Sequence, residues 1–207
     1  TSTLPTWLSF DANTGVLSGT PLNAHVGTQS VTVQAEDTAG ATATQTFTIT
    51  ISNTNDAPTI DSTAVTAIDE DSSYLYTVTA SDVDVGDNVA LSATIPSSST
   101  WLTFEPSTGK LTGTPANGDV GTHSITVTAT DDAGDTGSQT FTITVANTND
   151  APTISSTAVI AVDEDSLYTY TVTGDDVDAN DGMTLSVTST LPTWLSFDAN
   201  TGVLSGT

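Results

Sequence analysis

The 207-residue chain carries 25 aspartate and glutamate residues against a single basic side chain, Lys110, for a formal net charge of −24. A surface this acidic repels nucleic acid and anionic lipid, so we expect neither as a partner. Cysteine is absent, so disulfide bonds cannot stiffen the protein. No apolar run approaches the roughly 20 residues of a membrane-spanning helix, so we expect no membrane insertion in this segment.

The sequence repeats itself along its length. Residues 1–20 recur letter for letter at residues 188–207, and a divergent copy lies at residues 94–114. The copies are marked by three tryptophans spaced 94 and then 93 residues apart: Trp7, Trp101 and Trp194. A fixed period of this size is typical of a tandem array of one small domain type. We expect the chain to be a window on a longer array built from a 187-residue pair of non-identical domains.

Three domains are predicted: the C-terminal part of one at residues 1–53, a complete one at 54–147, and the N-terminal part of a third at 148–207. The complete domain holds seven short segments rich in β-branched or alternating apolar residues, separated by Gly, Pro, Asn and Asp turns. They are Pro58–Ile68, Tyr74–Thr79, Val89–Ile95, Trp101–Phe104, Lys110–Thr112, Ser124–Thr130 and Gln139–Val145. This pattern predicts an all-β fold of tandem seven-stranded Ig-like Greek-key sandwiches arranged end to end. No segment shows helical periodicity.

Acidic side chains gather at places that recur from one repeat to the next. The recurring groups are Asn55-Asp56 and Asn149-Asp150, Asp69-Glu70-Asp71 and Asp163-Glu164-Asp165, residues 82–88 and 176–182, and Asp37 and Asp131, with Asp119 in addition. Any one of these acidic residues, taken alone, is typical of a solvated loop or of a turn. Their recurrence favours Ca²⁺, which takes six to eight oxygen ligands. Zinc or copper is disfavoured, because cysteine is absent and the two histidines occupy non-equivalent positions.

Three of these motifs together resemble tandem cadherin-like repeats of the dystroglycan type, found in large secreted bacterial adhesins including the RTX adhesins. The resemblance covers essentially the whole chain. It is carried by Asn-Thr-Asn-Asp-Ala-Pro at residues 53–58 and 147–152, Asp-Val-Asp-Val-Gly-Asp-Asn at 82–88, and Val-Thr-Ala-Thr-Asp at 127–131. The resemblance implies cadherin-like sandwiches with calcium held between consecutive domains.

The resemblance also implies a ligand set for each junction. For the first junction the set is Asn55, Asp56, Asp82, Asp84, Asn88 and Asp131. For the second it is Glu70, Asp119, Asn149, Asp150, Asp176 and Asp178. The chain departs from the family at Asn53 and Asn147, where many cadherins have aspartate, and it lacks the Asp-Arg-Glu motif. Because His25 stands at the position equivalent to Asp119, we expect the first junction to bind calcium more weakly or to hold fewer ions.

These features favour a structural function: calcium-rigidified extender domains of a secreted or cell-surface bacterial adhesin or extracellular filament, serving cell adhesion or matrix formation. The alternative is a carbohydrate-binding module for extracellular polysaccharide. Its candidate platforms are two tyrosine pairs with i, i+2 spacing, Tyr74 with Tyr76 and Tyr168 with Tyr170, although such a strand face is more simply half-buried. We do not expect an enzyme, because no nucleophile, phosphate-loop or metal–water motif is present.

The expected partners are the neighbouring repeats of the same chain. The two ends suggest a further partner, because residues 1–52 supply the later strands of a domain and residues 153–207 supply the earlier ones. Such ends could complete one sandwich head to tail between molecules and form a filament. In a longer chain the same residues would simply continue the array.

Overall fold

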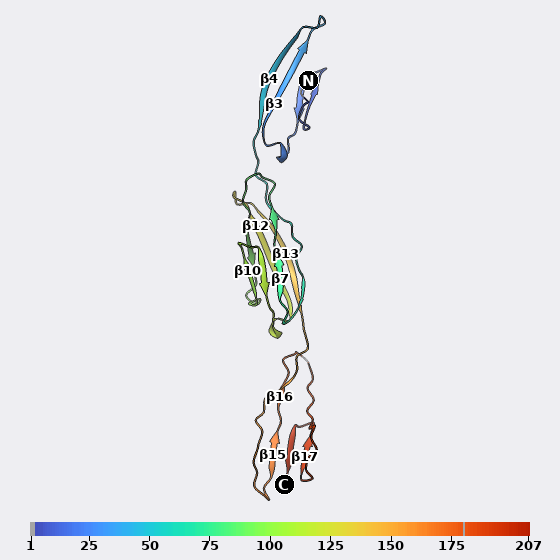
Figure 1. Ribbon diagram of the computed structural model, residues 1–207, viewed down its shortest axis with the longest axis vertical. Coiled ribbons are helices and arrows are strands. Elements are labelled where there is room, and N and C mark those ends of the chain that lie inside the picture. The colour runs from blue at the N-terminus through green and yellow to red at the C-terminus, as the bar shows by residue number, and fades with distance from the viewer. Residues whose placement is uncertain (1–2, 180) are drawn as a thin grey trace.

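The computed structural model describes residues 3–179 and 181–207, and its strands form three units that follow one another along a single long axis (Figure 1). The first unit contains β1 (Leu8–Asp11), β2 (Val16–Gly19), the 3₁₀ helix η1 (Asn23–His25), β3 (Gly27–Glu36) and β4 (Thr42–Ile51). The middle unit contains β5 (Thr59–Ile60), β6 (Ala67–Asp69), β7 (Tyr74–Thr77), β8 (Ala80–Ser81), β9 (Ala90–Thr94), β10 (Leu102–Glu105), β11 (Lys110–Gly113), η2 (Asn117–Asp119), β12 (Gly121–Thr130) and β13 (Thr136–Ala146). The third unit contains β14 (Thr153–Ile154), β15 (Tyr168–Thr171), β16 (Gly174–Asp175), β17 (Leu195–Asp198) and β18 (Val203–Gly206).

The middle unit is a two-layered β-sandwich, which confirms the predicted fold class. One sheet has the order β6-β13-β12-β9, and the facing layer holds β10-β11-β7 and the short pair β5-β8. All neighbours are antiparallel except β13 and β6, which run parallel. Alternating side chains of both layers fill the space between them, because successive residues of a strand face opposite sides. The core cluster consists of Tyr74, Tyr76, Val78, Leu102, Leu111, Ile125, Val127, Phe141 and Ile143.

The structure divides one of the seven predicted segments and shortens another. The run at residues 58–68 contributes β5 and β6, which belong to different layers because β5 pairs with β8 and β6 with β13. The run at residues 74–79 contributes only β7, which ends at Thr77, and β8 follows at residues 80–81, where it pairs with β5. The structure also contains η1 and η2, which were not predicted. Each spans only three residues, which is too short to produce a helical period in the sequence.

In each unit, a glycine at the end of one strand packs against the backbone of the tryptophan and fixes its position. Gly113 lies directly against the backbone carbonyl oxygen of Trp101, where an added Cβ would overlap that oxygen, and the same holds for Gly19 with Trp7 and Gly206 with Trp194. The contact is possible only for a residue without a side chain. It explains why Ser-Gly-Thr or Thr-Gly-Thr follows every copy of the tryptophan motif.

The Trp101 ring connects the core of the middle unit to the second junction. It packs edge-on against His123, with ring centroids 5.6 Å apart. The two ring nitrogens of His123 are held by the Ser99 hydroxyl and the backbone oxygen of Asp119, each at 2.7 Å. Asp119 is the last residue of η2, so this chain of contacts fixes the short helix that faces the next unit.

Candidate metal centres at the two junctions

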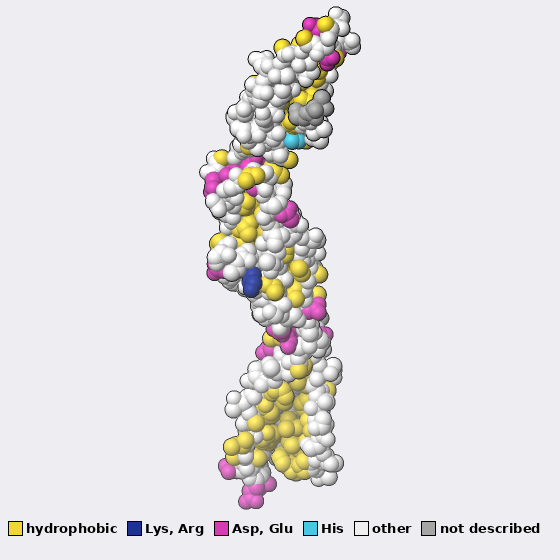
Figure 2. Space-filling model, turned by 45° about the horizontal axis from the view of Figure 1, so that its top comes forward, with side chains coloured by type: hydrophobic (Ala, Val, Ile, Leu, Met, Phe, Trp, Pro, Cys, Tyr) yellow, Lys and Arg dark blue, Asp and Glu magenta, His cyan; other side chains and the backbone are white. Residues whose placement is uncertain are grey.

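Two short connections, residues 53–56 (the first junction) and 147–150 (the second junction), join the units. Figure 2 shows acidic side chains gathered around both connections and hydrophobic surface exposed on the third unit. Only one basic side chain is present in the whole sequence, so arginine or lysine cannot neutralise these groups. Their negative charge must be balanced by solvent, by salt or by bound cations.

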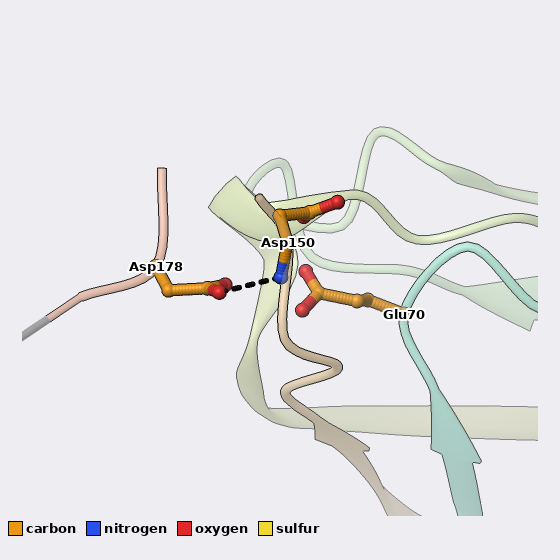
Figure 3. Close-up of side chains that lie close together, drawn as sticks. All are labelled: Glu70, Asp150 and Asp178. Carbon is orange, nitrogen blue, oxygen red and sulfur yellow. Dashed lines mark hydrogen bonds between the residues drawn. The ribbon is translucent and has the colours of Figure 1, made fainter. Parts of the chain in front are cut away.

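Three carboxylates from three parts of the chain converge at the second junction (Figure 3). Glu70 comes from the turn after β6, Asp150 from the connection itself, and Asp178 from the loop after β16. One carboxylate oxygen of each lies within 4.8 Å of the others. The cluster therefore spans both units and the connection between them.

Two of these carboxylates are almost completely withdrawn from solvent. Glu70 is 1% exposed and Asp178 is 6% exposed. In each, one oxygen accepts a backbone N–H of the connection at 2.7 Å, Thr148 for Glu70 and Asp150 for Asp178. The other oxygens, Glu70 Oε2 and Asp178 Oδ1, are buried and have no hydrogen-bond partner among the residues that the structure describes. Burying an unpaired carboxylate is costly, so this arrangement fits a bound cation.

A second acidic cluster shares Asp178 and lies within the third unit. It consists of Asp176, Asp178 and Asp181, again with one oxygen from each within 4.8 Å of the others. The turn is held by the N–H of Asp178, which donates to Asp176 Oδ1 at 2.9 Å. Asn180, part of the same sequence motif, lies outside the described residues. Two cation positions bridged by Asp178 would account for both clusters.

The first junction has an equivalent arrangement around Asp84, which is 5% exposed. Its Oδ2 accepts the N–H of Asp56 at 2.7 Å, as Asp178 does with Asp150. In this loop the usual placement of polar and apolar side chains is reversed, because the carboxylate of Asp84 is buried while the neighbouring Val85 is 97% exposed. Asp84 Oδ1 accepts the Asn23 side-chain amide at 3.5 Å, so both oxygens have hydrogen-bond donors, unlike those of Asp178. No basic side chain in the described residues neutralises the buried charge of Asp84, so a bound cation fits here too.

A cluster of Asp82, Asp87 and Asp131 completes the first junction. Asp82 Oδ2 is buried and without a hydrogen-bond partner within the described ranges. The Asn55 side-chain amide donates to Asp131 Oδ2 and to Asp135 Oδ2, both at 2.8 Å. The Asn55 hydrogen bond, helped by backbone N–H groups and partly opposed by burial, lowers the pKa of Asp131 below its usual value.

The structure brings most of the predicted ligands together, and three have other hydrogen-bond partners. Asn88 donates to Asp132 Oδ2 through its backbone N–H and its amide, at 3.3 and 3.0 Å. Asn149 donates to the backbone oxygen of Asp150 at 2.9 Å. Asp119 accepts the N–H of Ala116 at 3.0 Å and so closes η2. The predicted ligand roles of all twelve residues remain predictions, including those of the nine that lie close together.

Two pairs of equivalent residues at the junctions were not predicted from the sequence. Asn117, the first residue of η2, donates its side-chain amide to Asp150 Oδ2 at 2.6 Å, and Asn23 of η1 does the same to Asp56 Oδ2 at 2.6 Å. Each therefore links a preceding unit to the connection that follows it. The two asparagines are 94 residues apart, so the repeat itself contained the signal. The second pair is Asp87 and Asp181, which lie in the acidic loops at residues 82–88 and 176–182 and join the acidic clusters there, although neither is in the predicted ligand sets.

His25 and Asp119 have the same structural role in their two units. The Nδ1 atom of His25 accepts the N–H of Leu22 at 2.8 Å, and the carboxylate of Asp119 accepts that of Ala116. A histidine thus replaces a carboxylate at the first junction without changing the turn. The prediction that the first junction binds calcium more weakly remains open.

Replacing Asp87 with Asn should have effects of opposite sign with and without calcium. Burial, followed by repulsion from Asp132 and Asp82, raises the pKa of Asp87 in the folded protein. A carboxyl with a raised folded-state pKa costs stability above that pKa, so at pH 7 the variant should melt a few degrees higher in chelator. In calcium it should gain less stability than the parent, because a charged ligand is lost.

Calorimetry in chelator and in calcium measures both effects of this substitution. Glu105→Gln is the control, since Glu105 is exposed and lies outside every cluster, and it should change neither melting temperature. A loss of stability in chelator for Asp87→Asn would contradict the prediction.

The fold and junctions define a class of protein, tandem Ig-like sandwiches arranged as in cadherin repeats. The chain belongs to the family described as "Putative Ig domain", whose model matches residues 1–52, 57–146 and 151–207. It superimposes on the extracellular domain of protocadherin GammaB4 with a TM-score of 0.57 at 20% identity, covering 100% of this chain and 37% of that one. For human CDH23 EC21-23 the TM-score is 0.58 at 17% identity, covering 96% of this chain and 70% of that one.

The chain is also similar in sequence to a staphylococcal adhesin. It is 36% identical over 134 residues to the serine-rich adhesin for platelets of Staphylococcus aureus strain MRSA252, covering 63% of this chain. The same adhesin from strain USA300 is 35% identical to the chain over 134 residues. The chain spans only 9% and 6% of these two relatives. Within the described part of the chain, no helix is both long and apolar enough to cross a bilayer.

Proposed function

We propose that these units are calcium-rigidified spacer domains of an extracellular adhesin, in which bound cations set the angle between neighbours. The observation that carries the proposal is the meeting of Glu70, Asp150 and Asp178 at the second junction. These side chains come from two units and their connection, and two of them are buried with an unpartnered oxygen. A cation there would be bound by both units at once.

Calcium would supply the positive charge that the chain lacks. At the second junction Glu70, Asp150, Asp176, Asp178 and Asp181 would hold it. At the first junction the holders would be Asp82, Asp84, Asp87 and Asp131, with Asn55 and Asp56. Oxygen-only donors of this kind suit calcium better than zinc or copper.

Electrostatic forces would explain why bound cations stiffen the junctions between units. Without cations the carboxylates of adjacent units lie well inside the ~10 Å Debye length and repel one another, so an open joint is favoured. With cations the same groups attract a common centre, and each unit loses its freedom to swing. Binding to the folded form alone also adds stability by mass action.

The comparison with the staphylococcal adhesin supports the extracellular placement and the adhesive role. Extracellular calcium modules need only 10⁻⁴–10⁻³ M affinity, which partly exposed clusters can provide. The acids recur once per unit and lie at the joints, which suits a structural element better than a catalytic one. Assignment to an RTX-type adhesin remains a prediction from the sequence resemblance.

The carbohydrate-binding alternative is not favoured by the tyrosine pair of the middle unit. Tyr74 and Tyr76 are 1% and 3% exposed, and they face the core. Tyr76 packs edge-on against Phe141, with ring centroids 5.5 Å apart. A sugar could not stack on either ring without opening the sandwich.

Small-angle scattering with and without chelator tests the proposed function. Calcium should lengthen the particle and narrow its distribution of shapes, and it should raise the melting temperature by several degrees. Magnesium serves as the control, because it prefers a compact octahedral site and retains its waters. Identical scattering curves and melting temperatures in calcium and chelator would overturn the proposal.

A further inference from the structure

Asparagine is followed directly by glycine at only one place in the sequence, Asn117-Gly118. The pair lies in η2, the short helix that faces the third unit. Gly118 is exposed, and a Cβ added to it would meet no atom within 4 Å. Within the described residues, its backbone N–H makes no hydrogen bond. The peptide nitrogen that follows the Asn117 side chain is therefore open to solvent and unobstructed.

An asparagine side chain can react with the peptide nitrogen that follows it. The Gly118 nitrogen would lose its proton and attack Cγ of Asn117, forming a C–N bond that closes a cyclic imide. The bond from Cγ to the side-chain nitrogen breaks, and this nitrogen takes up the proton and leaves as ammonia. Water then opens the ring and yields aspartate or isoaspartate. Glycine favours the attack because it has no side chain to obstruct the nitrogen.

The closed junction restrains this reaction. The Asn117 side-chain amide donates to Asp150 Oδ2 at 2.6 Å, so it is directed across the junction and away from its own main chain. The η2 turn is closed by the N–H of Asp119, which donates to the Ala116 oxygen at 2.7 Å. Attack on Cγ requires the side chain to fold back, so the contact with Asp150 must break first. The reaction should therefore proceed only from molecules in which the junction has opened locally.

We propose that Asn117 is a site of spontaneous deamidation that records the opening of the second junction and then alters its response to cations. The first half of the proposal stands on the Asn117-Gly118 pair and its contact with Asp150. The second half rests on the proposed calcium function, because it concerns the acidic cluster that would hold the ion.

Deamidation would replace a hydrogen-bond donor with a negative charge. The Asn117 amide now donates to Asp150, whereas the aspartate product is ionised at pH 7 and only accepts hydrogen bonds. A further carboxylate would then stand beside the cluster of Glu70, Asp150 and Asp178. Without cations it would repel Asp150, and with calcium it would be an additional oxygen ligand. The modified junction would therefore be weaker in chelator and would gain more from calcium.

Isoaspartate would act on the turn itself. In this product the main chain passes through the former side-chain carbon, so the backbone inside η2 becomes longer. The last residue of η2 is Asp119, whose backbone oxygen lies 2.7 Å from Nε2 of His123. A displaced η2 would therefore disturb the contact that connects the junction to the core.

The first junction contains a matched site that should not react. Asn23 lies in η1, is half-buried like Asn117, and donates its amide to Asp56 Oδ2 at the same distance of 2.6 Å. The residue after it is Ala24, whose methyl group obstructs the approach of the peptide nitrogen to Cγ. The two sites therefore share the turn and the hydrogen bond but differ in the residue that controls the reaction.

Mass spectrometry of the ageing chain tests the modification site. The full chain is held in chelator at mildly alkaline pH, and samples are digested with pepsin at low pH, which also stops the reaction. The Asn117 peptide should gain the mass that replacement of an NH₂ group by OH produces, at least about tenfold faster than the Asn23 peptide. Gly118→Ala should remove this difference, and Ala24→Gly should make Asn23 react as fast as Asn117. An unreactive Asn117, or equal rates at the two sites of the parent, would overturn the proposal.

A second pair of variants tests whether the contact with Asp150 restrains the reaction. Asp150→Ala removes the acceptor of the Asn117 amide, so Asn117 should react faster than in the parent in chelator. Asp56→Ala removes the equivalent acceptor at the first junction and should leave the rate at Asn117 unchanged. The same rate at Asn117 in both variants would show that the reaction does not record the opening of this junction.

Calcium tests the second half of the proposal. At a calcium concentration of about ten times its Kd, the rate at Asn117 should fall about tenfold, because the open fraction falls by that factor. Asn117→Asp supplies the aspartate product in pure form. It should melt below the parent in chelator and gain more than the parent from calcium. Asn13→Asp adds the same charge to an exposed hairpin and should alter neither melting temperature. Equal calcium responses in the parent and in Asn117→Asp would overturn this half.

These measurements separate the modification from the calcium function. Fast reaction of Asn117 at the same rate in calcium and in chelator, with no effect of calcium on melting, would support the modification site and refute the calcium function. Calcium-dependent melting of a chain whose Asn117 does not react would refute the modification site and support the calcium function.

Discussion

Replacing Glu70 with Gln is expected to weaken calcium binding at the second junction by about 100-fold, on the order of 3 kcal/mol. The substitution preserves the size of the side chain and an oxygen that can accept the Thr148 N–H. It removes one buried negative charge from the cluster with Asp150 and Asp178. In chelator the variant should be at least as stable as the parent, because the same change relieves repulsion. Isothermal calorimetry and melting curves measure the two effects.

Glu164→Gln provides the matched control for this prediction. Glu164 occupies the equivalent position in the third unit, where it is exposed and belongs to neither of the two junctions. This change should leave the calcium affinity of the two junctions within about twofold of the parent. Equal losses in the two variants would mean that Glu70 acts through overall charge and not as a ligand.

Replacing Gly113 with Ala should destabilise the middle unit by about 3 kcal/mol or more. The new methyl group would overlap the Trp101 carbonyl oxygen, and neither the carbonyl nor the strand that carries Gly113 can move without breaking the pairing of β10 with β11. Because Trp101 holds His123, and His123 holds η2, the second junction should lose its geometry as well. Urea unfolding followed by tryptophan fluorescence reports the loss.

The control for this substitution is Gly118→Ala in η2. An added Cβ at Gly118 meets no atom within 4 Å, so the change should alter stability by less than about 0.5 kcal/mol. If Gly113→Ala unfolded at the same urea concentration as the parent, the tight approach between Gly113 and Trp101 would not constrain the sandwich.

The sandwich could be predicted from the sequence because apolar and polar residues alternate strictly along its long strands. In β12 and β13 every second residue is apolar and buried, from Ile125 to Ala129 and from Phe141 to Val145. The split of residues 58–68 into β5 and β6 could not be foreseen, because it depends on which layer each half joins. Such pairing is set by distant strands, here β8 and β13, and leaves little trace in the local pattern.

The candidate site was predictable where acids are clustered in sequence and less so where single residues reach in from elsewhere. Asp82, Asp84 and Asp131 were named from motifs, and the structure places them together at one junction. Asn117 was missed because a lone asparagine before glycine is typical of an ordinary turn. Its contact with Asp150 depends on how one unit meets the next, which no pattern within a single unit encodes.

The parallel pairing of β6 with β13 has a mechanical consequence. In the middle unit the chain enters at one pole and leaves at the other, so a pulling force along the array loads the two-residue strand β5 first and then acts between β6 and the last strand β13. Because these strands run in the same direction, such a load is applied in shear, and the bonds from Thr144 N–H to Thr66 and from Glu70 N–H to Ala146 must yield together. A tether built from such units should resist extension better than one whose terminal strands could be peeled apart one bond at a time.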